Sequence, residues 1–234
     1  MQVTVARKLV AEGVGTALLV AAVVGSGIMA QTLARDPAVA LLANTLATGG
    51  ALVAILLVFG PISGAQLNPA VTVCMAFTRD LTPPVAVGYI VVQIAGGIAG
   101  AALANAMFDL APITLSATVR AGFPKLLSEA VATFGLLGVV IAVGRTRAPA
   151  APFAVAAYIV AAYWFTASTS FANPAVTIGR AFSDTYAGIR PADVPGFIAA
   201  QAVGATVATL LFCWLVPITS LPRSRPAGTA QTPG

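Results

Sequence analysis

The chain has 234 residues, of which 59% are hydrophobic and only 8% are charged. A soluble domain carries roughly a quarter charged residues because its surface faces water, so this composition excludes a soluble protein and indicates a single membrane-embedded domain. The net charge is +5, but the twelve Lys and Arg residues stand singly or in pairs between apolar runs, which is typical of membrane loops and argues against nucleic-acid binding.

The sequence contains no histidine and only two cysteines, Cys74 and Cys213. Histidine is the commonest general base and the commonest ligand of zinc, copper and iron. Both cysteines fall in apolar runs, where we expect them to be small buried hydrophobic residues. We therefore expect no catalytic residue, no metal site and no cofactor.

The apolar runs predict six membrane-spanning helices, because a bilayer core needs about 20 apolar residues of helix. Short charged or proline-containing segments separate these runs. The helices are expected at about 9–33, 39–59, 85–108, 126–143, 152–169 and 194–216.

Two shorter apolar stretches, 68–77 and 173–182, each open with Asn-Pro-Ala. About ten residues of helix rise about 15 Å, which is half a membrane. Asn as the N-cap followed by Pro at the first helical position is a strong signal for a helix start. Each stretch therefore predicts a re-entrant half-helix, which is tolerated at membrane depth only where it is buried in protein or lines a wet cavity.

The two halves of the chain repeat each other. Residues 68–72 and 173–177 are identical, and a Glu-x-x-x-Thr pattern recurs at Glu12 and Glu129. Each half holds three spans, an odd number, so the second copy must be inverted in the membrane. The predicted fold class is an all-α membrane protein with six transmembrane helices plus two re-entrant half-helices in an inverted repeat.

The repeat also sets the expected domain limits. A channel domain is expected over residues 1–221, with repeat one at about 1–110 and repeat two at about 123–221. The first apolar run resembles a signal peptide, but its removal would leave the repeat unmatched, so we interpret it as the first spanning helix. The tail 222–234 is rich in Pro, Arg, Ser and Gly and is predicted to be disordered.

The basic residues predict the orientation in the membrane. With the N-terminus inside, seven Lys and Arg residues fall in cytoplasmic segments and five in outer segments. Four of the five acids outside the predicted spans also fall on the outer side. We expect a multi-pass protein of a bacterial-type inner membrane with both termini in the cytoplasm.

This pattern resembles the major intrinsic protein family, the aquaporins and aquaglyceroporins, over about residues 10–217. Two Asn-Pro-Ala motifs in register with an inverted repeat are highly specific. The resemblance implies six tilted helices, a pore through each monomer, a homotetramer in the lipid bilayer and no cofactor. The residues that carry the resemblance are the run 63–72, the second motif and the helix residues Glu12, Glu129 and Gln93.

The paired motif has a physical meaning of its own. Each half-helix N-terminus carries roughly half a positive charge, so two such ends facing each other at the pore centre repel cations. Asn68 and Asn173 can donate amide hydrogen bonds to a passing oxygen while capping fixes their orientation. The expected pore motif residues are Asn68, Pro69, Ala70, Asn173, Pro174 and Ala175.

Glu12 and Glu129 are acids inside apolar helices, so each needs buried partners. The resemblance implies that such glutamates hold the loops that lead to the half-helices. We favour this structural role over proton transfer. Gln93 and Gln201, which follow the two motifs by 25 and 28 residues, are expected to act as further structural anchors.

The resemblance also implies a four-residue selectivity filter on the outer side. Counting from the asparagines places it at Thr48, Ala161, Ser170 and Val176, and Phe171 can take the place of Ser170. The family normally has Arg where this chain has Val176. All four residues are small, so we expect a filter that is wider than in a water pore and lacks the usual fixed positive charge.

Two further residues bear on the pore. Arg180 shares the pore-facing side of its half-helix about 10 Å beyond Asn173, which predicts a place in the outer vestibule. The alternative is that its side chain simply reaches the membrane interface. Gln66 stands where the family usually has His before the first motif.

A wide, neutral filter suits small uncharged polyols, and As(OH)3 is an uncharged mimic with three hydroxyl groups. The chain resembles the aquaglyceroporin-like proteins associated with bacterial arsenic resistance. The hypothesis is a passive channel for arsenite, related metalloid acids and glycerol-like polyols, with water. The first alternative is a general aquaglyceroporin for glycerol, urea and water without a metalloid role.

Two other classes are less favoured. A coupled secondary transporter would need a coupling acid at mid-membrane. Glu12 and Glu129 are the only intramembrane acids, and we interpret both as structural anchors of the loops. A membrane enzyme would need a metal cluster or a nucleophile–base pair, which the sequence does not offer.

Overall fold

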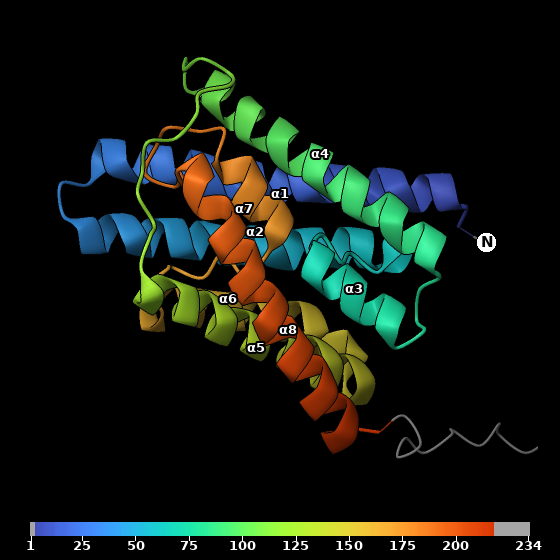
Figure 1. Cartoon of the computed structure of the whole chain (residues 1–234). Coiled ribbons are helices and arrows are strands. Elements are labelled where there is room, and N and C mark those ends of the chain that lie inside the picture. Colours follow the sequence, from blue (N-terminus) through green and yellow to red (C-terminus); the bar gives the residue numbers. More distant parts are fainter. Residues whose placement is uncertain (1–2, 218–234) are drawn as a thin grey trace, which may run out of the picture.

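The computed structural model describes residues 3–217, and the predicted disordered tail lies outside them. Within this range the chain is helical, with no β-strand (Figure 1). Six helices are long and apolar enough to cross a membrane, which confirms the predicted fold class and a multi-pass membrane protein. They are α1 (Val5–Leu33), α2 (Pro37–Ser63), α4 (Pro83–Met107), α5 (Phe123–Thr146), α6 (Ala151–Phe165) and α8 (Val194–Leu215). The fifth and sixth spans include the turns that precede α6 and α8, so they cover Ala148–Phe165 and Pro191–Leu215.

Two half-helices complete the described fold, α3 (Pro69–Phe77) and α7 (Pro174–Arg180). Short 3-10 turns, η1 (Ala148–Ala150) and η2 (Pro191–Asp193), precede α6 and α8. The observed ends differ from the expected ones by a few residues. Helix α6 stops at Phe165, four residues before the expected end, because the chain there turns into the irregular loop that leads to the second motif.

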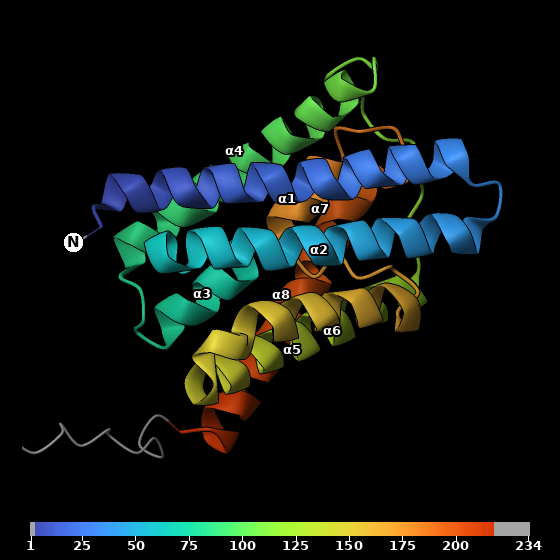
Figure 2. The same cartoon turned by 180° about the vertical axis from the view of Figure 1, so that it is seen from behind.

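The half-helices enter the bundle from opposite sides, as an inverted repeat requires. We call the side where α1 begins the N-side and the side where α1 ends the far side. In Figures 1 and 2, α3 runs from the middle of the bundle to the N-side, and α7 runs from the middle towards the far side. Helix α1 packs on α4 as α5 packs on α8, and the two half-helices touch each other in the middle.

Proline and capping residues set where the helices begin. Helix α2 starts with Pro37, and the Asp36 carboxylate accepts from the backbone N–H of Ala38 at 2.7 Å. Proline stands in the first turn of every helix except α1. Helix α2 ends at Ser63, and its C-cap Gly64, with a φ of +91°, turns the chain sharply into the loop before the first motif.

Close helix contacts depend on glycine. A Cβ atom added at Gly100 of α4 would collide with the backbone carbonyl of Ala17 on α1. In the second repeat, a Cβ at Gly204 of α8 would collide with the carbonyl of Ala130 on α5. Such small residues let helix backbones approach each other within a membrane, where lipid offers no hydrophobic drive for association.

We expect Gly100→Ala to lower the free energy of unfolding by about 1–3 kcal/mol, because the added methyl forces α1 and α4 apart. Denaturant titration of the purified protein in detergent, followed by tryptophan fluorescence, measures this. Gly50→Ala is the matched control, since Gly50 is exposed on α2 with no atom within 4 Å of an added Cβ. Equal stability of the two variants would contradict the close-contact argument.

Candidate functional site

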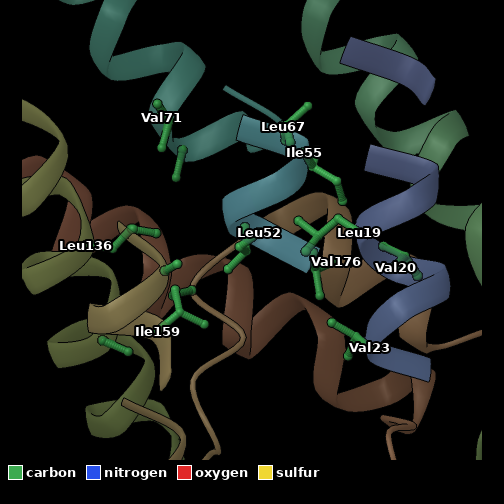
Figure 3. Close-up of a cluster of buried hydrophobic side chains, with 14 of the residues drawn as sticks. Leu19, Val20, Val23, Leu52, Ile55, Leu67, Val71, Leu136, Ile159 and Val176 are labelled. Atoms are coloured by element: carbon green, nitrogen blue, oxygen red, sulfur yellow. The ribbon is translucent and has the colours of Figure 1, made fainter. Parts of the chain in front are cut away.

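A cavity of about 640 Å³ runs through the bundle between its two halves. Arg180 lies at the end of the cavity wall that is nearer the far side. Asp80 and Arg145 lie at the end that is nearer the N-side. Most of the wall is apolar. Figure 3 shows part of it, with Leu52 and Val176 on one side and Leu136 and Ile159 on the other.

The two asparagines of the repeated motif lie on the cavity wall and are bonded crosswise. The Asn68 amide nitrogen donates to the carbonyl of Ala172 at 2.8 Å, and that of Asn173 donates to the carbonyl of Leu67 at 2.8 Å. Each asparagine therefore caps its own half-helix while it binds the loop before the other one. An amide nitrogen carries two hydrogens, so each asparagine keeps one donor for a molecule in the cavity.

The capping half of this arrangement uses the side-chain oxygens. Asn68 Oδ1 accepts from the N–H of Ala70 at 2.9 Å, and Asn173 Oδ1 accepts from the N–H of Ala175 at 2.9 Å. The prolines that follow, Pro69 and Pro174, occupy the first helical position, where no N–H is needed. The orientation of both amides is thus set by the backbone and does not depend on a bound solute.

Glu12 holds the loop before α3. Its carboxylate accepts from Ser63 Oγ at 2.6 Å, from the N–H groups of Gln66 and Leu67 at 2.9 and 2.6 Å, and from Gln93 Nε2 at 2.8 Å. The carboxylate is fully buried. Four donors around one carboxylate compensate the cost of burying it.

Glu129 does the same for the loop before α7. Its oxygens accept from the N–H groups of Phe171 and Ala172, both at 2.9 Å, and from Gln201 Nε2 at 2.6 Å. Gln201 also donates to Thr177 Oγ1 at 2.9 Å, as Gln93 does to the equivalent Thr72 at 3.0 Å. The two buried networks are therefore copies related by the repeat.

Both loops have strained backbone. Leu67 and Ala172, the residues just before the two asparagines, have φ values of +50° and +47°. Ala65, Thr169 and Ser170 lie in the same left-handed region, at +44°, +62° and +50°. Such conformations are costly for residues with a Cβ and persist only where neighbours hold them. The glutamate bonds supply that hold.

The far part of the cavity is built from helices α2 and α6, the loop before α7, and α7 itself. Thr48, Ser170 and Val176, three of the residues expected in the filter, all line the cavity. Phe171 lines it as well, so both residues considered for that place reach the wall. The hydroxyl of Ser170 is buried and has no hydrogen-bond partner among the described residues.

The expectation for Ala161 was wrong. Ala161 is exposed on the outside of α6 and does not line the cavity. Tyr163 lines it instead, buried and within 3.4 Å of Thr48 Oγ1 through its hydroxyl. Two residues along a helix amount to about 200°, so the two positions lie on nearly opposite faces. A tyrosine in an apolar span needs a partner for its hydroxyl, and that signal could have identified it.

Arg180 is buried inside the protein and does not extend to its surface. Its side chain is only 2% exposed and lines the cavity. Its Nε donates to the carbonyl of Ala187, and its guanidinium carbon lies 3.4 Å from the centre of the Phe171 ring. The expected filter of small, uncharged side chains is therefore incomplete, because Tyr163, Phe171 and Arg180 belong to the same part of the wall.

The N-side end of the cavity has a different lining. Gln66, Asp80 and Arg145 contribute to its wall, whereas Arg79 is exposed and does not. Arg145 donates to the carbonyl of Val216 at 2.7 Å and so ties the end of α5 to the end of α8. In residues 3–217 no three potential metal ligands of the His, Cys, Asp or Glu type lie together.

A cavity with two crosswise-bonded half-helix starts on its wall, inside six membrane-length helices, defines a membrane channel. The model of the major intrinsic protein family matches residues 1–148. The chain is 53% identical over 210 residues to aquaglyceroporin AqpS of Rhizobium meliloti (strain 1021), covering 90% of each chain. The chain belongs to the major intrinsic protein family, and it is a channel and not an enzyme.

Two more distant comparisons agree with this assignment. The chain is 33% identical over 188 residues to the glycerol uptake facilitator protein-like 6 of Lactiplantibacillus plantarum, covering 75% of this chain and 83% of the relative. The structure of the aquaglyceroporin from Plasmodium falciparum superposes with a TM-score of 0.69 at 17% identity, covering 91% of this chain and 95% of the other. The structural likeness speaks for the fold alone.

We expect Glu129→Gln to lower both solute flux and stability, because Phe171 and Ala172 donate to different oxygens of Glu129, and in glutamine one of these atoms becomes an NH2 group that cannot accept. Each buried donor left without a partner costs about 1–3 kcal/mol. Stopped-flow glycerol flux in proteoliposomes and thermal unfolding in detergent measure the two effects. Asp109→Asn is the control, the same chemical change at an exposed acid. Full flux through Glu129→Gln would contradict the anchoring role.

Proposed function

We propose that this channel conducts small neutral solutes with hydroxyl groups, namely glycerol-like polyols, arsenite and related metalloid acids, together with water. The observation that carries the proposal is the pair of amide donors, Asn68 and Asn173, on a mostly apolar cavity wall. A neutral solute exchanges its hydration for these donors as it passes. An ion loses far more hydration than they return.

The metalloid part of the proposal rests on Val176. This apolar side chain lines the cavity where members of the family normally carry arginine. The small size of Val176 leaves room beside Thr48 and Ser170. We assign the fourth filter position, expected at Ala161 from the sequence, to Tyr163. As(OH)3 is uncharged at neutral pH and presents three hydroxyl groups, so it meets the same donors as a polyol.

A second candidate is an aquaglyceroporin for glycerol, urea and water that has no metalloid role. It is favoured by the two relatives described above, an aquaglyceroporin and a glycerol uptake facilitator protein-like 6, whose names refer to glycerol and not to arsenic. A coupled transporter is disfavoured, because Glu12 and Glu129 both spend their oxygens on loop donors and are not left free to bind a coupling ion.

We further propose that the N-side faces the cytoplasm of a bacterial-type inner membrane. Burial of Arg180 removes one cation from the far-side loops, which leaves four there: Arg35, Arg120, Lys125 and Arg190. The N-side segments carry seven in the sequence, so the bias that favours a cytoplasmic N-side is larger than the sequence count suggested. The homotetramer implied by the family resemblance is part of the same proposal.

We expect Val176→Arg to reduce arsenite and glycerol flux by about tenfold or more while water flux persists, because a long cationic side chain narrows the wall. Flux into proteoliposomes of the purified protein measures all three solutes. Val176→Leu adds bulk without charge and is the matched control. If Val176→Arg leaves arsenite and glycerol flux unchanged, the wide-filter argument is wrong. Glycerol flux without arsenite flux in the wild type would favour the second candidate.

A further inference from the structure

Arg180 is a buried cation. The family resemblance places Val176, and not Arg180, at the filter position where the family has its arginine. It follows Val176 by four residues on α7, so it shares that face and lies about 6 Å nearer the far side. Both side chains line the same cavity, and both are almost fully buried. The wall therefore contains a fixed positive charge one helical turn beyond the place where the family has its arginine.

The guanidinium is held by more than one contact. Its Nε donates to the carbonyl of Ala187, and its central carbon lies over the Phe171 ring, 3.4 Å from the ring centre. Phe171 is fixed in turn, because its N–H donates to Glu129 and its ring packs edge-on against Phe197 at 5.2 Å. This arrangement restricts the head group of Arg180 to one place on the wall.

Arg120 supports the same cluster from the loop that precedes α5. Its guanidinium carbon lies 4.9 Å from the Phe171 ring centre, and it donates to the carbonyls of Gly188 at 2.7 Å and Tyr186 at 3.2 Å. These two carbonyls belong to the residues on either side of Ala187, whose own carbonyl accepts from Arg180 Nε. Burial lowers the pKa of Arg120, but an arginine stays protonated in proteins. Arg120 is a positioning residue for Arg180 and a second positive charge.

Neither charge has a carboxylate partner. Among residues 3–217, side chains within ion-pair distance occur only at Arg190 and Asp193. The Nη1 atom of Arg180 is buried and has no hydrogen-bond partner among the described residues. A buried cation without an anionic partner is costly to the fold, so its retention on the wall points to a role of the charge itself.

We propose that Arg180 is a specificity-determining residue that takes over, from one turn further out, the charge that Val176 does not supply. Its positive potential excludes cations and protons. The inference rests on the proposed conduction of neutral solutes. It separates two tasks along the wall: Val176 leaves width, and Arg180 selects by charge.

Arg180→Gln in the full-length protein tests this. Proteoliposomes report cation and proton leak through an enclosed pH-sensitive dye under an imposed K⁺ gradient, and glycerol flux through light scattering. We expect the leak to rise by about tenfold or more, because the wall loses its fixed charge. Arg180→Lys keeps the charge and should keep the leak low. Arg35→Gln, at an exposed far-side arginine, removes the same charge outside the cavity and should change nothing.

A purely structural role predicts a different result. Arg180 would then only hold the 181–190 loop, and folded Arg180→Gln would exclude cations like the wild type, which would overturn the inference. If Arg180→Gln does not fold, Arg180→Met, which keeps the packing on Phe171, gives the same reading. A wild-type channel that leaks cations as fast as the Arg180→Gln variant would also overturn the inference. Wild-type vesicles without glycerol or arsenite flux would refute the proposed function instead.

Discussion

The structure depends on hydrogen bonds from backbone N–H groups in two irregular loops to two buried carboxylates. Without Glu12 and Glu129, the left-handed residues before each asparagine would have no partner inside the membrane, where water cannot replace one. The loops set the asparagines, the asparagines cap the half-helices, and the half-helices shape the cavity wall. Two buried carboxylates thus determine the geometry of the pore.

The fold followed from the sequence because its signals are local and strong. Apolar runs of membrane length predicted the spans, and Asn-Pro-Ala predicted the half-helix starts, both confirmed by α1 to α8. Positions within the same helix as a motif could be placed by counting, as at Val176. Ala161 could not, because the count crossed the loop 166–173, whose left-handed residues break any regular spacing. Tyr163 and the buried stack of Arg180 on Phe171 depend on tertiary contacts that spacing does not encode.

The far part of the wall also shows why one filter position is a poor guide to a whole pore. Replacing arginine with valine at a single place suggests a wide, uncharged passage. The structure has a guanidinium one turn away, together with a tyrosine and a phenylalanine. If Arg180 selects by charge as proposed, charge and width are set by different residues, and a substitution at one of them leaves the other unchanged.

The crosswise bonds between the asparagines have a consequence for how the protein is made. The amide of Asn68 binds a carbonyl that lies 104 residues further along the chain. When ribosomal synthesis has completed the first repeat, that acceptor does not yet exist, and the first re-entrant segment has only its own cap and Glu12. The pore centre can close only after the second repeat has entered the membrane. Assembly of the conducting path is therefore a late event, and neither half forms it alone.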